Sequence, residues 1–120
     1  MTQADIWYTI AVIFFISIDY VTGVVKAIMR DDLNSRKMRE GLGHKFVYII
    51  LVLVAWFIDE VNLHVDLGLP VSVFVCTVSG ICLIELTSIL ENITAINPEL
   101  ADAPFMRIFA QNTNGKHEAE

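Results

Sequence analysis

The sequence predicts an all-α integral membrane protein with three transmembrane helices, and its composition and charge distribution support this fold class. Of its 120 residues, 55% are hydrophobic and 18% are charged, whereas soluble domains carry about 45–50% apolar and roughly 25% charged residues. Six of the eight lysines and arginines lie between residues 26 and 45, with apolar sequence on either side. Since a spanning helix needs about 20 mostly apolar residues, this length allows three or at most four crossings.

The first predicted span covers residues 6–29. It begins with the aromatic pair Trp7 and Tyr8, which is typical of a membrane interface, and it stops before Arg30. We do not expect a cleaved signal peptide, because residues 1–5 contain no lysine or arginine and no small-residue cleavage site follows the apolar run. The apolar run is therefore interpreted as a retained helix.

The second predicted span covers residues 42–60. A polar loop from Arg30 to Lys45 is expected before it, because this segment is rich in charge and contains the helix-weakening Gly41 and Gly43. The span ends at two acidic residues, which begin a short acidic connector over residues 59–66.

The third predicted span covers residues 67–90, with Pro70 in its first turn, where proline is tolerated. Residues 1–97 would then form the membrane domain and residues 98–120 a cytoplasmic tail. The tail is too short and too polar to span. Two interpretations of residues 99–109 stay open, an amphipathic helix lying on the membrane surface or an ordinary tail, and residues 111–120 are expected to be disordered.

The charge asymmetry predicts the orientation. Lysine and arginine are enriched in cytoplasmic loops, and the loop after the first span holds most of them, whereas the connector over residues 59–66 holds none. The expected cytoplasmic basic loop comprises Arg30, Arg36, Lys37, Arg39 and Lys45. With three spans, the N-terminus of this multi-pass protein would lie outside and the C-terminus in the cytoplasm.

Polar residues inside the first span form one stripe at helical spacing. A charged group at the centre of a spanning helix costs about 2.5–3.5 kcal/mol, so each one requires a partner or a function. The stripe consists of Asp19, Thr22, Gly23, Lys26 and Arg30. Lys26 and Arg30 can extend toward the interface, but Asp19 lies about 16 Å along the axis from Arg30. We therefore expect its partner on another helix, on another subunit or in water.

The third span carries two further patterns. One stripe is polar and consists of Glu85, Ser88 and Asn92. A different face carries small residues at four-residue spacing, namely Ser72, Cys76 and Gly80, a pattern that lets helices approach closely. Packing within one subunit and packing between subunits both remain open for this face. Asp19 and Glu85 likewise are either a structural polar pair or groups facing an oligomer surface or a lumen.

No pattern of catalytic, metal or nucleic-acid chemistry stands out. His44, His64 and His117 are scattered, and no zinc-protease, nucleophile-elbow or phosphate-loop motif occurs. Cys76 and Cys82 lie six residues apart, which prevents a bridge within one helix and favours a packing role. We therefore expect no enzymatic activity, no cofactor and no nucleic-acid partner, and membrane lipid as the surroundings.

Two blocks of the sequence resemble the toxin-secretion and phage-lysis holin family. The first block runs from Asp19-Tyr20-Val21-Thr22-Gly23 through Lys26-Ala27, Leu33-Asn34-Ser35 and Gly41-Leu42 to Lys45, and the second is Glu85-Leu86 with Ser88-Ile89-Leu90-Glu91-Asn92. Together they cover about residues 15–97. Ile84, Met38 and Asn97-Pro98 depart from the family pattern.

The resemblance implies a holin that forms homo-oligomeric lesions in the cytoplasmic membrane. Such lesions release a cell-wall hydrolase (endolysin) or a protein toxin, without requiring direct contact with it, and the host lyses. The residues alone indicate only a small, self-associating three-span protein. A small ion channel or transporter that uses Asp19 and Glu85 is one alternative, and a non-conducting antiholin or membrane-complex subunit is another.

Overall fold

The computed structural model describes residues 2–102, and in this range the chain forms three long α-helices and one short 3-10 helix. The long helices are α1 (Gln3–Met29), α2 (Ser35–His64) and α3 (Val73–Ile96), and the 3-10 helix η1 covers Pro98–Asp102. Each long helix contains an apolar stretch sufficient to cross a membrane. At 1.5 Å per residue the three helices are about 40, 45 and 36 Å long, longer than a hydrocarbon core of about 30 Å. The predicted fold class is confirmed.

Local side-chain contacts fix the ends of α1. Thr2 and Asp5 form a capping box at its start, in which Thr2 Oγ1 accepts a hydrogen bond from Asp5 N and Asp5 Oδ2 accepts one from Thr2 N, both at 3.1 Å. At its end Asp31 adopts a left-handed backbone conformation with a φ of 53°. The Asp32 amide then donates to the Ala27 carbonyl oxygen, which closes the last turn.

The loop expected from Arg30 to Lys45 is wrong for most of its length, because α2 begins at Ser35. Asn34 caps the helix, and its Oδ1 accepts a hydrogen bond from Arg36 N at 2.8 Å. The residues that follow are mostly good helix formers, so the helix continues through both Gly41 and Gly43. Lys45 therefore lies ten residues inside α2, and only residues 30–34 connect it to α1.

The connection between α2 and α3 also differs from the expectation. Helix α2 continues to His64, past the acidic pair predicted to end the span, and α3 starts at Val73 instead of residue 67 and ends at Ile96 instead of residue 90. Gly68 takes a φ of 71°, which a helix does not allow, and Pro70 precedes α3 instead of lying in its first turn. Residues 65–72 are consequently a non-helical connection.

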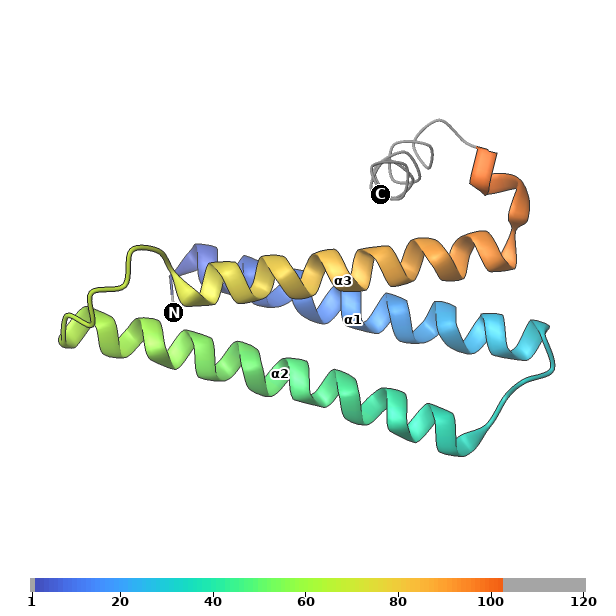
Figure 1. Ribbon diagram of the computed structural model, residues 1–120, viewed down its shortest axis with the longest axis horizontal. Helices are drawn as coiled ribbons and strands as arrows, with labels where there is room; N and C mark the ends of the chain where they lie inside the picture. The colour runs from blue at the N-terminus through green and yellow to red at the C-terminus, as the bar shows by residue number, and fades with distance from the viewer. Residues whose placement is uncertain (1, 103–120) are drawn as a thin grey trace, which may run out of the picture.

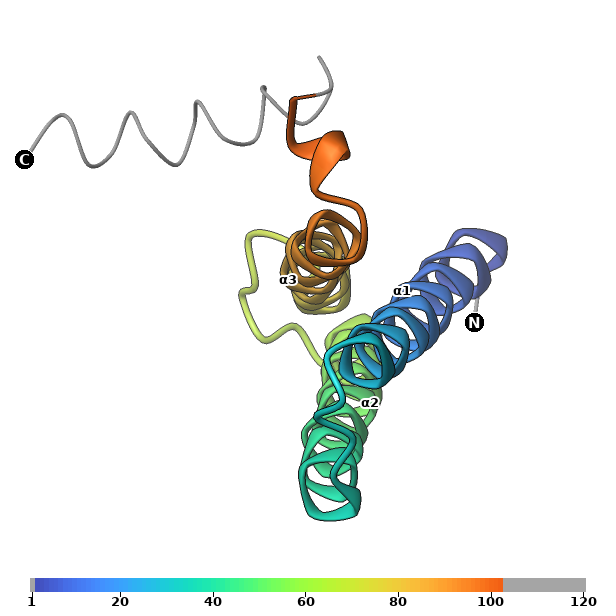
Figure 2. The ribbon, with the colours of Figure 1, turned by 90° about the vertical axis from the view of Figure 1, so that its right-hand side faces the viewer.

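Helix α3 packs against both α1 and α2, whereas α1 and α2 contact each other less (Figure 1). The buried apolar core consists of Val12, Val52, Phe74, Val78 and Ile81. Seen along the bundle, α2 diverges from α1 and α3 toward residues 30–34 (Figure 2). Consistent with this divergence, the buried residues of α2 are Val52 and Ala55, both in its second half.

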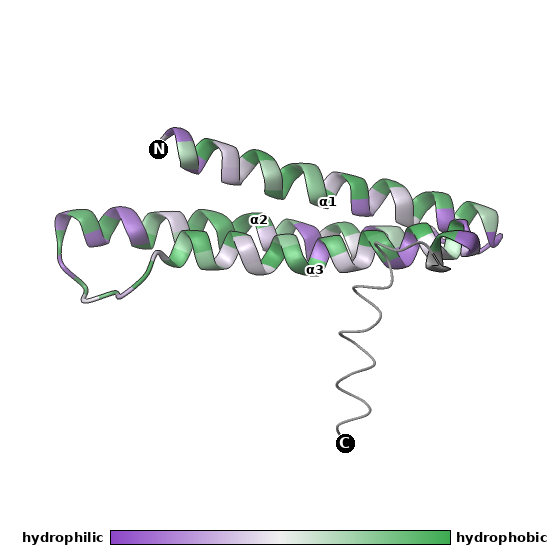
Figure 3. Ribbon diagram, turned by 90° about the horizontal axis from the view of Figure 1, so that it is seen from above, coloured by the Kyte–Doolittle hydropathy of each residue, from purple (hydrophilic) through white to green (hydrophobic). Residues whose placement is uncertain are grey.

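The outer surface of the helices is strongly apolar. Many large side chains stay exposed, including Trp7 and Phe14 of α1, Phe46 and Phe57 of α2 and Leu83 of α3. Figure 3 shows hydrophobic residues along all three helices, with hydrophilic residues gathered mainly toward the ends. This surface suits lipid as a solvent better than water. Of the tail segment 99–109, residues 99–102 belong to the 3-10 helix η1. Residues 103–109 and the disorder predicted for residues 111–120 lie outside the described residues.

Candidate functional site: a buried ion cluster and a cleft

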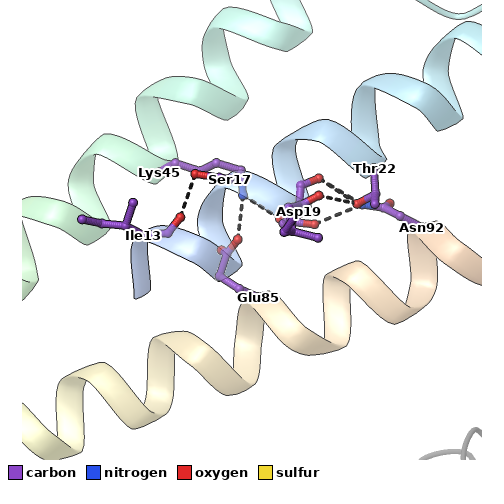
Figure 4. A network of polar contacts seen from close by, with 8 residues as sticks. Ile13, Ser17, Asp19, Thr22, Lys45, Glu85 and Asn92 are labelled. Carbon is purple, nitrogen blue, oxygen red and sulfur yellow. Dashed lines mark hydrogen bonds and ion pairs between the residues drawn. The ribbon is translucent and has the colours of Figure 1, made fainter. Parts of the chain in front are cut away.

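A lysine of α2 joins the three helices by binding two carboxylates. Lys45 Nζ lies 2.5 Å from Asp19 Oδ2 of α1 and 2.8 Å from Glu85 Oε2 of α3 (Figure 4). The exposed side-chain fractions are 13% for Lys45, 9% for Asp19 and 3% for Glu85, so both contacts are shielded. These charge-assisted hydrogen bonds belong to the strong class because they are short and buried.

Asn92 extends this group of charged side chains toward the end of α3. Its Nδ2 donates to Asp19 Oδ1 at 3.0 Å and to Thr22 Oγ1 at 3.1 Å, and it lies 3.3 Å from the Asp19 carbonyl oxygen. Gly23 lies alongside, since a Cβ at this position would stand 3.7 Å from the same nitrogen. We use the name ion cluster for Asp19, Lys45, Glu85 and Asn92 together.

The cluster lies at one level of the bundle. Asp19 is ten residues before the end of α1, Lys45 is ten residues after the start of α2 and Glu85 is eleven residues before the end of α3. These positions correspond to about 15–17 Å along each helix from the end that carries residues 30–34. The cluster therefore lies deeper than the membrane–water interface that the helix ends would occupy, and its charges belong to the interior of the spans.

Pairing explains how these charges are tolerated. An unpaired ionised group buried in a spanning bundle is costly, and truncating one partner of a buried ion pair typically costs about 3–5 kcal/mol. One ammonium here meets two carboxylates, with a formal sum of −1 when all three are ionised, and the Asn92 amide adds a donor to Asp19. The cluster therefore adds to the apolar core a polar contact among all three helices that depends on their mutual position.

A cleft of about 330 Å³ leads to this cluster from the end of the bundle that carries residues 30–34. Asp19, Lys45 and Asn92 line it at the cluster, and Lys26, Asp32 and Lys37 line it nearer the helix ends. Its lining comes from α1, from the connection over residues 30–34 and from α2, with Asn92 on α3. Ser88 belongs to its lining as well, so most of the two predicted polar stripes borders one cavity.

The remaining residues of the predicted basic loop lie at the surface. Arg36 pairs with Glu40 at 3.3 Å and Lys37 pairs with Asp32 at 3.4 Å, and all four side chains are at least 62% exposed. Such exposed pairs contribute little to stability. Arg30 caps α1, and Arg39 is exposed on α2. The structure thus separates Lys45, which is half-buried in the ion cluster, from the other basic residues.

Of the predicted small-residue face, Ser72 contacts another helix of the described residues, because its hydroxyl donates a hydrogen bond to Asp59 of α2. Ser72 is the N-cap of α3, Cys76 is exposed, and a Cβ placed on Gly80 would meet no atom within 4 Å. Within residues 2–102, no neighbouring helix approaches Gly80. Close packing of this face between subunits stays a prediction.

Asp59 is a structural residue that sequence reasoning missed. Its carboxylate, on α2, accepts hydrogen bonds from Val73 N at 2.9 Å, from Phe74 N at 3.1 Å and from the Ser72 hydroxyl. These bonds satisfy amides at the start of α3 that have no partner within the helix. An acid at the end of one apolar run, shortly before a serine that begins the next, was the available signal.

Lys45 as the partner of Asp19 was also missed, although it was singled out as a basic residue. The available signal was its place directly before the uninterrupted apolar run that starts at Phe46. A cation at that depth can reach acids on neighbouring spans. Among residues 2–102 no group of three or more histidine, cysteine or acidic side chains could hold a metal ion.

The fold and the buried cluster define a small multi-pass helical membrane protein. The family model of the bacteriophage holin family matches residues 2–103, and the chain therefore belongs to that family, which is a family of non-enzymatic membrane proteins. The suspected holin family is thereby confirmed.

The chain is also similar to a bacterial protein over part of its length. An uncharacterised protein of Halalkalibacterium halodurans is 36% identical over 75 residues, which cover 62% of this chain and 56% of the relative. The match thus spans little more than half of the relative's length. No solved structure matches the chain.

Proposed function

We propose that this chain acts as a holin, which accumulates in a bacterial cytoplasmic membrane, associates with copies of itself and opens lesions that end in host lysis. The observation that carries the proposal is the family match over residues 2–103. The three helices long and apolar enough to cross a membrane support it. The lesions would release an endolysin or a toxin without requiring contact with this chain.

Self-association follows from the size of the chain. A bundle of three helices, with α1 and α2 packed against α3, leaves no room for a lumen that a protein could cross, so a lesion requires several copies. The ion cluster satisfies its charges within one chain, and the outer faces of the helices are apolar. Copies would therefore associate mainly through apolar and small-residue packing, as transmembrane helices generally do.

For orientation we propose that residues 30–34 face the cytoplasm, because the basic residues of the chain gather at that end. The N-terminus of α1 lies at the opposite end of the bundle and the end of α3 at the same end as residues 30–34 (Figure 1). The N-terminus would then be outside and the C-terminus cytoplasmic. In a background without Cys76 and Cys82, cysteine at Val65 should react with a membrane-impermeant thiol reagent in intact cells. Cysteine at Ser35 should not react. Labelling of position 35 alone would show that the orientation is the reverse of the proposed one.

The contacts argue against an ion channel or transporter that uses Asp19 and Glu85 as its binding groups. Lys45 already occupies both carboxylates at hydrogen-bond distance, so a transported cation would have to displace a tethered ammonium. An antiholin or a membrane-complex subunit would share the fold and is separated by the lysis experiment below.

The test is controlled expression of the full chain in bacteria, with and without a co-expressed endolysin that lacks its own export signal. We expect abrupt loss of viability after a delay, and release of the endolysin only when both proteins are present. The matched control is Arg36→Gln, which changes an exposed residue of the same helix. Continued growth of the cells while the chain accumulates in the membrane would reject the proposal that it is a holin. If the chain instead delays lysis by a second, co-expressed holin, it is an antiholin.

A further inference from the structure

The outer part of the cleft between α1 and α2, near the helix ends, carries an excess of positive charge. Its charged lining comprises three lysines, Lys26, Lys37 and Lys45, and two acids, Asp19 and Asp32. At the inner end Lys45 pairs with Asp19 and with Glu85 behind it, which leaves a formal charge of −1 there. Nearer the helix ends Lys37 pairs with Asp32, and Lys26 has no ion-pair partner among residues 2–102, so this outer part of the lining carries one formal positive charge in excess.

The walls of the cleft between these charges are apolar or lack a side chain. Val24 and Ala27 come from α1, and Met38 and Gly41 come from α2. The added Cβ on Gly41 would meet no atom within 4 Å, so this wall is open. At about 330 Å³ the cleft reaches the size of small-molecule sites in proteins. A ligand that fits must combine one negative charge with an apolar portion.

The position of the cleft indicates where such a ligand comes from. Lys26 and Lys37 lie about 10–12 Å along their helices from the ion cluster, toward the helix ends. This is the level at which a spanning helix meets the headgroups. Leu42 and Phe46, which lie on α2 like Lys37, expose large apolar side chains on the outside of the bundle. Basic pockets between transmembrane helices are known to receive anionic headgroups.

We propose that this cleft binds an anionic phospholipid with a singly charged phosphodiester, such as phosphatidylglycerol. The phosphate lies at Lys26, with Lys37 nearby. The part of an acyl chain next to the headgroup lies against the apolar walls where α2 diverges from α1. A lipid in this seam would fill the space that protein atoms leave between the two helices. Its presence would bias the separation of α1 and α2, and hence the shape that each copy offers to the next.

The test is native mass spectrometry of the detergent-solubilised full chain, titrated with dioleoyl phosphatidylglycerol or dioleoyl phosphatidylcholine. We expect a preference for phosphatidylglycerol. Lys26→Gln should weaken its binding about fivefold, the value expected for one basic contact near an anionic surface. Arg36→Gln is the control, because Arg36 is an equally basic residue of the same end that does not line the cleft.

A second pair of variants tests the cleft itself. Gly41→Leu places a bulky side chain in the cavity and should reduce lipid binding, whereas Gly43→Leu, two residues along the same helix and outside the lining, should not. Equal loss in Lys26→Gln and Arg36→Gln, or equal affinity for both lipids, would overturn the proposal. Inorganic phosphate serves as the second probe. Lys26-dependent binding of phosphate without a lipid preference would assign the site to a free anion and overturn the lipid.

Discussion

The two ends of the bundle are held together by different interactions. Near residues 65–72, α3 meets α2 through Asp59, and Val52, Phe74 and Val78 provide tight apolar packing. Near residues 30–34, α2 has no buried side chain, and Lys45 makes its polar link to the other helices.

This difference shows how charge can replace packing in a membrane. Apolar side chains gain little by leaving lipid for a protein interior, so an apolar half is held by close fit. In the other half α2 diverges from α1 and α3, and a cleft takes the place of packing between α1 and α2. A buried ion pair is directional and depends on distance, so it can fix helices that do not touch along their length.

The largest expected effect comes from removing the shared cation. Lys45→Met leaves two carboxylates adjacent and buried without their partner, which should destabilise the chain by about 3–5 kcal/mol. The measurement is reversible unfolding in mixed micelles, followed by helicity. Arg36→Met is the control, with an expected change below about 0.5 kcal/mol. Comparable losses of stability in the two variants would mean that the ion cluster does not hold together the half of the bundle near residues 30–34.

Removing the two acids sharpens the same comparison. Asp19→Asn or Glu85→Gln alone leaves Lys45 one carboxylate and should cost about 1–3 kcal/mol. The double variant strands the ammonium, so its loss should exceed the sum of the single losses. Unfolding of all three variants under the same conditions measures this coupling. Additive losses would contradict the view that both acids serve one lysine.

In the other half the test residue is Asp59. Asp59→Ala removes the acceptor for two amides and a hydroxyl at the start of α3 and should cost about 1–2 kcal/mol, as loss of a helix cap does. Hydrogen exchange should rise at Val73 and Phe74 and stay unchanged around Lys45. Faster exchange in both halves would show that the two ends are coupled.

The smallest effect on the isolated chain is expected at Gly80. Because an added Cβ meets nothing within 4 Å, Gly80→Leu should leave unfolding and accumulation unchanged within about 0.5 kcal/mol. If the small-residue face lies between subunits, cross-linked oligomers should decrease and lysis should be delayed. Poor accumulation would place the face inside one subunit, and unchanged cross-linking with unchanged lysis would reject the face as a contact.

The amino-acid sequence by itself determined the fold class, the number of helices and the residues that share a polar face. Apolar runs of sufficient length leave few alternatives to spanning helices. The period of 3.6 residues places Asp19 with Thr22 and Glu85 with Asn92. The need of Asp19 for a partner beyond its own helix also followed from spacing, because Lys26 is two turns away.

Only the tertiary structure decided which partner Asp19 has and where α3 begins. Helical period fixes a face within one helix, but not the rotation or axial position of the next. Lys45 was therefore assigned to a loop, although α2 carries it about 15 Å into the bundle to meet both acids. The start of α2 depends on a local cap, Asn34, whereas that of α3 depends on Asp59 from another helix. The contact of Asp59 joins two helices, so the period within either helix does not reveal it.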